Sequence, residues 1–278
     1  MIERGFPNDL PVRPAHSLQL DWWITQRNLI NIWLPEGVFS DAGSIEWFLL
    51  RDVTDLRWSS AKDGAWESRF AMKDRCEVVT RTTERKDGVD FTIRLTNRSV
   101  KTWPNANMPV CVQLATAPDF RDPGLQRTYH HAKDGWRKFA PTDAKPVYPG
   151  GCHFFGGMRL RACLESAIGV PTLVGCLSKR PPIPPKGGTP NGCKRLSKHT
   201  LSKGNDSGRA EIRASSKCGQ WHLSHSFDNA VSVGGNCHES ICCVHANPVV
   251  GELKPGETKE SRGWLHVRKE SVNARPLG

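Results

Sequence analysis

The sequence predicts an all-β protein, an antiparallel β-sandwich, and three observations support this fold class. Short apolar runs alternate with polar residues at a period of two, clusters of Pro, Gly and Asn separate the runs, and no long capped stretch shows the period of a helix. Short strands divided by turns are typical of a sandwich. One sandwich can reach the chain's 278 residues, so we expect a single domain over 1–278.

Seven segments carry the strand pattern, in chain order: 18–25, 29–34, 76–83, 89–96, 110–115, 220–227 and 258–268. The clearest is 89–96, where four apolar residues occupy alternate positions, which indicates a half-buried strand. Asp87-Gly88 lies directly before it and indicates a hairpin turn. Lys254-Pro255-Gly256-Glu257 indicates a second tight turn before the last segment. The best helix candidate is 158–168.

A stretch near the middle of the chain, 171–210, differs from both of its flanks. Between Lys179 and Arg209 the chain has eight Lys and Arg, one acid and five Pro, so this segment holds +7 of the formal charge of +11. Proline blocks regular pairing, and few apolar residues are available for a core, so we expect a disordered insertion over 171–210.

Three explanations of the insertion stay open. It is a tolerated surface loop, a corrupted stretch of reading frame, or an arm that binds nucleic acid or a membrane surface. Loop closure grows only logarithmically with length, so a folded domain can absorb such a loop. No aromatic residue is interleaved with the basic ones, which argues against nucleic acid as a partner.

The first twenty residues bear on where the protein is located. They carry Glu3, Arg4, Asp9 and Arg13, charges that the apolar region of a signal peptide would not contain. No run of about 18 apolar residues occurs in the chain, so no membrane span is expected. We therefore expect a cytoplasmic protein with reduced thiols, unless a mis-assigned start codon hides an export signal. The oligomeric state is left open.

Two pieces of sequence resemble a known group of proteins. One is VDFTIRLTNRSVKTW followed by MPVCVQLATAPDF, and the other is GGNCHESICCVHANPVVGELKPGETKESRGWLHV. They resemble an uncharacterised family of bacterial β-sandwich proteins, which is similar in overall look to the galactose-mutarotase-like supersandwich. The resemblance covers roughly 20–140 and 220–270 and skips the insertion. It implies a supersandwich fold and, by analogy only, the handling of carbohydrate; the family offers no activity to carry over.

The candidate catalytic residues are those of a sugar epimerase, which needs a carboxylate base and an acid, often His, on opposite sides of a ring carbon. They are His130, His131, His153 and Glu239. Asp119 and Asp122 could add further carboxylates, but their Ala-Pro-Asp-Phe-Arg-Asp-Pro-Gly context also fits a plain turn. The ligand-binding candidates are Trp136, which could stack on a sugar or simply pack, and His245.

A segment rich in Cys and His is the candidate metal site, with Cys237, His238, Cys243 and His245 as its residues. Cys and His are the usual ligands of zinc. Cys243 and His245 share a face of an extended strand, and a hairpin over 239–241 would bring Cys237 or His238 beside them. The spacing matches no zinc signature, and neighbouring residues on a strand point apart, so all four do not easily converge.

Three other interpretations of this segment stay open. They are a disulfide from Cys237 to Cys242 or Cys243, ordinary buried thiols beside a hydrogen-bonded histidine, and a catalytic Cys–His pair. The sequence requires no cofactor, and zinc is the metal that these residue types suggest.

The function that the sequence favours is that of a carbohydrate-binding or carbohydrate-modifying sandwich protein. The competing hypothesis is a non-catalytic structural or protein-interaction domain. A carbohydrate enzyme should gather several of the His and Glu candidates in one place. An interaction domain should scatter them and expose an apolar patch.

Overall fold

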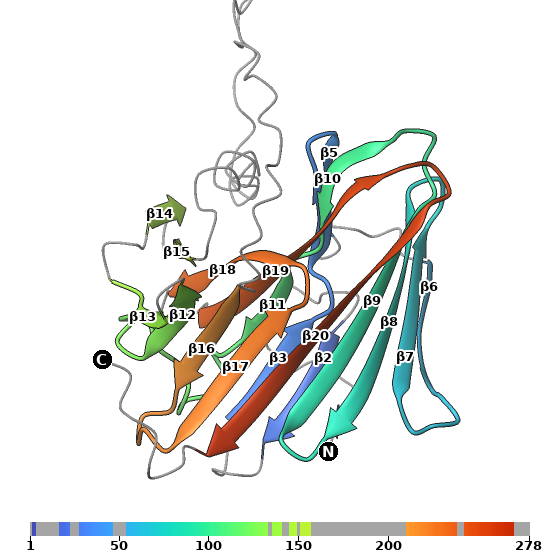
Figure 1. Cartoon of the computed structure of the whole chain (residues 1–278). Helices are drawn as coiled ribbons and strands as arrows, with labels where there is room; N and C mark the ends of the chain where they lie inside the picture. Colours follow the sequence, from blue (N-terminus) through green and yellow to red (C-terminus); the bar gives the residue numbers. More distant parts are fainter. Residues whose placement is uncertain are drawn as a thin grey trace, which may run out of the picture.

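The chain folds into two antiparallel β-sheets, which confirms the predicted fold class (Figure 1). The computed structural model describes residues 2–3, 17–22, 28–46, 54–132, 135–140, 145–148, 151–156, 210–237 and 242–269. Within these ranges every regular element is a strand. No helix in the described ranges could cross a membrane.

The first sheet has eleven strands, and β19 lies near its centre. Its main order is β1 (Ile2–Glu3), β2 (Ser17–Trp22), β3 (Asn28–Trp33), β11 (Val110–Gln113), β19 (Cys242–Leu253), β10 (Trp103–Asn107), β4 (Gly37–Ser40) and β5 (Gly43–Glu46). A branch leaves β19 through β18 (Ala230–Cys237), β15 (Gly151–Gly156) and β14 (Lys145–Tyr148).

The second sheet has nine strands, with the C-terminal strand β20 in its middle. Its order is β13 (Gly135–Lys138), β12 (Thr128–Ala132), β16 (Glu211–Ser215), β17 (Trp221–Phe227), β20 (Thr258–Lys269), β9 (Gly88–Asn97), β8 (Cys76–Arg85), β7 (Trp66–Met72) and β6 (Thr54–Ser60).

The core lies between the two sheets, where both contribute alternate residues. The predicted alternation over 89–96 is confirmed: the apolar residues of β9 are all buried in the core, while Arg94 on the same strand is exposed. On the other sheet Ile30, Ile32 and Val112 are fully buried. Each sheet therefore has one apolar face toward its partner and one outer face.

The predicted hairpin at Asp87-Gly88 joins β8 to β9, and its glycine is required by a close approach of β20. A Cβ atom on Gly88 would lie 2.0 Å from the carbonyl oxygen of Leu265, far inside van der Waals contact. Gly263 plays a similar part, since a Cβ there would lie 2.5 Å from the ring of Phe227. Only glycine lets these neighbouring groups pack so closely.

The second predicted turn, 254–257, connects the two sheets, because β19 belongs to one and β20 to the other (red in Figure 1). Asn97, at the end of β9, holds this turn. Its Nδ2 donates to the carbonyl of Leu253 at 3.0 Å, its N–H donates to the carbonyl of Glu257 at 3.0 Å, and its carbonyl accepts from Gly256 N–H at 2.8 Å. The two sequence pieces that carry the family resemblance thus meet at Asn97.

Several expectations need correction or stay untested. Strands β1, β4 to β7, β10, β12 to β16, β18 and β19 were not predicted, because they are short or follow no clean alternation. The helix candidate 158–168 lies outside the described residues, as does 171–209 of the expected insertion. Its last residue, Ala210, is buried and its N–H donates to the carbonyl of Ala230, so it belongs to the folded part.

Candidate functional site

The outer face of the eleven-stranded sheet is polar at its centre, unlike the face toward the core. On β11, Val110 and Val112 point into the core, so Cys111 and Gln113 lie on the other side. On β19, Val244 and Ala246 belong to the core, and the residues between and beside them take the outer side. We call this side the polar face.

The strand register places the residues of the polar face in two rows across six strands. The first row joins directly paired positions from β2 to β15: Gln19, Asn31, Gln113, Cys243, Asn236 and His153. The second row runs beside it: Ser17, Trp33, Cys111, His245, Gly234 and Phe155. Among the residues of the first row whose side chains the structure describes, Asn31, Gln113 and Asn236 carry amides and Cys243 carries a thiol, and all of these groups can take part in hydrogen bonds.

Four residues at the centre of the polar face form what we call the thiol–imidazole cluster: Glu36, Cys111, Cys243 and His245. The Nε2 atom of His245 lies 3.2 Å from Cys243 Sγ. The other ring nitrogen, Nδ1, lies 3.9 Å from a carboxylate oxygen of Glu36. The ligand atoms of Cys111, Cys243 and His245 all lie within 4.8 Å of one another.

The backbone explains why these residues meet. Cys111 and His245 are directly paired across β11 and β19, and Cys243 is two residues before His245 on the same face. Glu36 follows the end of β3, and its N–H donates to the carbonyl of Pro109, just before β11. Gln113 supports the cluster from the next position, because its Nε2 donates to Cys111 Sγ at 3.0 Å.

The surroundings set the protonation of the cluster. Burial raises the pKa of Cys111 well above its usual value. The hydrogen bond with Cys111 lowers the pKa of Cys243 well below the ordinary thiol value despite burial. Burial alone would lower the pKa of His245, but the neighbouring charges of Cys243 and Glu36 raise it to about 9. The cluster thus favours a thiolate beside an imidazolium.

Only part of the metal candidate set comes together. Cys243 and His245 are neighbours, whereas Cys237 is paired with Cys242 and both belong to the apolar core. Cys237 therefore lies on the face opposite Cys243. Cys242 and Cys243 are both free cysteines, so neither forms the disulfide that the sequence left open. His238 lies outside the described residues.

Cys111 and Glu36 were not among the predicted site residues. The signal for Cys111 was present in the run Val110-Cys111-Val112-Gln113, which alternates between apolar and polar residues. Its partner strand could not be read from that run, because β11 pairs with a strand that begins about 130 residues later.

The candidate catalytic histidines are divided between the two sheets. His130 and His131 lie on β12 of the nine-stranded sheet, while His153 lies on β15 of the eleven-stranded sheet, at a register position opposite Asn236. The ring of His130 is 4.7 Å from that of Phe139, between centroids. Glu239 lies outside the described residues.

Trp136 and the two aspartates are engaged in local packing and turns. Trp136 stacks under the guanidinium of Arg213 at 3.9 Å and meets the ring of His131 edge-on at 5.3 Å. Asp122 accepts hydrogen bonds from Arg127 N–H at 2.7 Å and from the hydroxyl of Thr128 at 2.8 Å. These contacts support the turn interpretation for Asp122, whereas Asp119 accepts a hydrogen bond from Asn28 Nδ2 of β3 at 2.8 Å.

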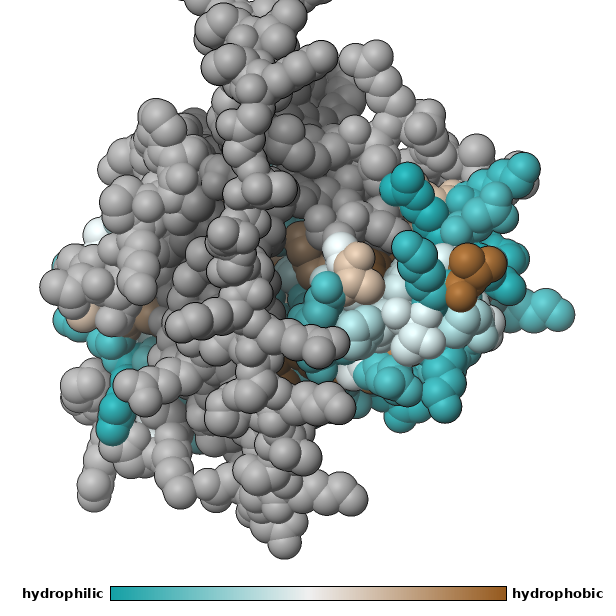
Figure 2. Space-filling model, turned by 90° about the horizontal axis from the view of Figure 1, so that it is seen from above, coloured by the Kyte–Doolittle hydropathy of each residue, from teal (hydrophilic) through white to brown (hydrophobic). Residues whose placement is uncertain are grey.

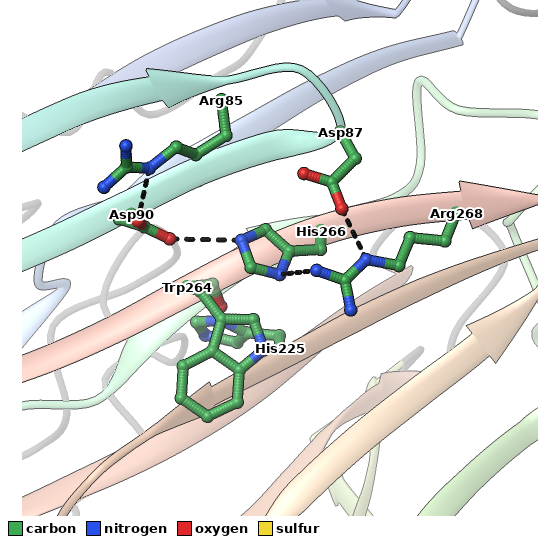
Figure 3. Close-up of polar contacts among 7 residues, drawn as sticks. All are labelled: Arg85, Asp87, Asp90, His225, Trp264, His266 and Arg268. Atoms are coloured by element: carbon green, nitrogen blue, oxygen red, sulfur yellow. Dashed lines mark hydrogen bonds and ion pairs between the residues drawn. The ribbon is translucent and has the colours of Figure 1, made fainter.

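A second polar cluster lies on the outer face of the nine-stranded sheet (Figure 3). Asp90 accepts hydrogen bonds from Arg85 Nε at 2.6 Å and from His266 Nε2 at 3.1 Å. Arg268 donates to His266 Nδ1 at 3.1 Å and is paired with Asp87. The charged groups of this cluster pair with one another, and Arg85 and Arg268 are exposed while Asp87, Asp90 and His266 are half-buried. Pairing of this kind is typical of a surface network.

No protein-family model matches the chain, and no curated protein matches it. Among solved structures, a proposed aldose 1-epimerase from Escherichia coli K12 is 11% identical, with a TM-score of 0.39, over 77% of this chain and 69% of that one. The Slr1438 protein from Synechocystis sp. PCC 6803 is 10% identical, with a TM-score of 0.41, over 90% and 81%. A proposed mutarotase from Salmonella typhimurium is 8% identical, with a TM-score of 0.37, over 95% and 96%.

The structural neighbours of this chain thus include proteins named as aldose epimerases and mutarotases. At identities of 11% and below and TM-scores near 0.4 they assign no residue and no activity to this chain.

Proposed function

We propose that this protein binds a carbohydrate on the polar face of the eleven-stranded sheet. The observation that carries the proposal is Asn31, which is buried in the first row and whose Oδ1 has no hydrogen-bond partner among the described residues. A buried acceptor without a partner lowers the stability of the fold by about 1–3 kcal/mol. Such a group is therefore expected where it serves another role, such as binding a ligand.

The chemistry of the rows fits a polyhydroxylated ligand. A sugar hydroxyl donates one hydrogen bond and accepts others, so amide side chains, which do both, are suited to bind it. Asn31, Gln113 and Asn236 supply three amides along one row, and half-buried Trp33 supplies an aromatic ring beside them in the next row. Uncharged amides with an aromatic neighbour favour a neutral sugar over a phosphorylated one.

The competing hypothesis of a protein-interaction domain has less support in the described residues. Their one exposed large hydrophobic residue is Val100, which is 93% exposed. Figure 2 shows mainly hydrophilic and neutral colours on the described part of one face, with only isolated brown. A single valine is not the extended apolar patch that marks a docking surface.

The test is calorimetric titration of the full chain with neutral mono- and oligosaccharides, together with a thermal-shift assay. A ligand at about 100 times its dissociation constant stabilises the fold by about 2.7 kcal/mol. Asn31→Ala should abolish the heat of binding. Gln126→Ala should leave it unchanged, because Gln126 is exposed in a turn and donates to the carbonyl of Gly124.

Proton NMR of the anomeric protons then separates binding from chemistry. Faster interconversion of the anomers with the protein than without it would extend the proposal to a sugar-modifying activity. A protein that binds no neutral sugar, or whose Asn31→Ala variant binds as tightly as the wild type, contradicts the proposal.

A further inference from the structure

We propose that Cys111, Cys243 and His245 bind one zinc ion on the polar face. The proposal goes beyond the carbohydrate site and does not depend on it. The sequence pattern placed Cys243 and His245 on one face of a strand, and the structure brings Cys111 beside them from β11.

The three ligand atoms are placed as zinc requires. Around a tetrahedral zinc, with bonds of about 2.3 Å to sulfur and 2.0–2.1 Å to nitrogen, ligand atoms lie about 3.5–3.8 Å apart. Cys243 Sγ and His245 Nε2 are 3.2 Å apart, and no pair in the set is more than 4.8 Å apart. Small side-chain rotations therefore suffice to close the three atoms around one ion.

The residues behind the ligands match the usual support of a zinc site. A histidine ligand generally presents its second nitrogen to a carboxylate or carbonyl, which fixes the ring. Here Nδ1 of His245 faces Glu36 at 3.9 Å while Nε2 faces the thiols. Gln113 Nε2 donates to Cys111 Sγ at 3.0 Å, a hydrogen bond that would stabilise the thiolate of this ligand.

The placement of the thiols distinguishes them from the other buried cysteines. Cys76, Cys237 and Cys242 belong to the hydrophobic core, where a thiol packs as a small apolar group. Cys111 and Cys243 are just as buried, at 1% and 3% exposure, but they lie outside that core, beside His245 and Gln113. Two thiols and an imidazole favour a soft divalent ion over calcium or magnesium, which prefer oxygen ligands.

Three protein ligands leave one position of a tetrahedral zinc to fill. Among the described residues no other Cys, His, Asp or Glu ligand atom joins this set. Three protein ligands and one open position are the arrangement of catalytic rather than structural zinc sites. The fourth ligand would then be water or a group of a molecule bound on the polar face.

The test uses the full chain, stripped with a chelator, dialysed and reloaded with Zn²⁺ or Co²⁺. Mass spectrometry of the metal content should give one zinc per chain. The cobalt form should show a thiolate-to-cobalt charge-transfer band and intense d–d bands of a tetrahedral site. Cys111→Ser, Cys243→Ser and His245→Gln should each lose stoichiometric binding, and Glu36→Gln should keep the site but bind zinc about 10–100-fold more weakly.

Two matched variants control for folding and for stray thiols. Cys242→Ser changes the residue beside Cys243 but on the core side, and Cys218→Ser removes an exposed thiol. Both should keep one zinc per chain, and circular dichroism reports whether each variant is folded. Wild-type protein without stoichiometric zinc, a cobalt form without the thiolate band, or equal metal loss in Cys242→Ser and Cys243→Ser would overturn the proposal.

Discussion

The outer faces of the two sheets are both polar, but they satisfy their polar groups in different ways. On the nine-stranded sheet, Asp90 and Arg268 are charged, at least partly exposed and paired with neighbouring side chains. On the eleven-stranded sheet, Asn31 and Cys243 are buried, and Asn31 Oδ1 has no hydrogen-bond partner among the described residues. Exposed charges that pair with each other are satisfied without a ligand. A buried polar group without a partner in the protein favours a ligand that supplies the missing hydrogen bond.

The largest expected effect is on the pH dependence of stability, and it comes from His225 in the core between the two sheets. This residue is fully buried in the core, its Nδ1 donates to the carbonyl of Trp264 at 2.8 Å, and burial lowers its pKa from 6.5 to about 4. The unfolded chain therefore binds a proton at higher pH than the folded one does. The stability that depends on His225 should be complete above about pH 6.5 and fall by about 3 kcal/mol between pH 6.5 and 4.

Urea unfolding at a series of pH values measures this loss, with His225→Phe as the comparison. The variant keeps an aromatic ring between Phe91 and Phe227, which both contact His225, and it should show a flat profile between pH 6.5 and 4. The surface carboxylate of Asp87, whose pKa is lowered chiefly by its hydrogen bond with Arg268, should add a loss only below about pH 4. An equally steep profile in His225→Phe would assign the acid sensitivity to the surface instead.

The next largest effect is the change in stability when Asn31 is replaced. It shows whether Asn31 serves a ligand or the fold. Asn31→Leu replaces an unpartnered buried acceptor by an apolar group of similar size. We expect the free energy of unfolding without ligand to rise by about 1 kcal/mol, because the buried orphan is removed. The same variant should lose carbohydrate binding. A fall in stability would show that Asn31 serves the fold itself.

The smallest effect belongs to the ion pairs of the nine-stranded sheet. Asp90→Asn removes the carboxylate that accepts from Arg85 and His266. Exposed pairs of this kind contribute about 1 kcal/mol or less, and salt screens them. Chemical unfolding of wild type and variant at low and high salt should show a small difference that shrinks with salt. A loss of several kcal/mol in the free energy of unfolding would show that the fold depends on this network.

Local patterns predicted local structure well. The alternation over 89–96 and the Asp87-Gly88 turn were confirmed, because strand period and turn chemistry are properties of neighbouring residues. The shared face of Cys243 and His245 followed from the same rule. Their partners did not, because Cys111 and Glu36 reach them through the order of β3, β11 and β19, which no local pattern encodes.

The position of β20 has a consequence for how the protein is made. β20 is near the C-terminus, yet it fills the middle of the nine-stranded sheet, between β9 and β17. While the ribosome is still adding residues, β6 to β9 can pair as a meander, but β9 keeps an open edge. That edge of β9 is closed only when β20 has been made, so until then β9 presents unpaired backbone groups that favour pairing with other chains.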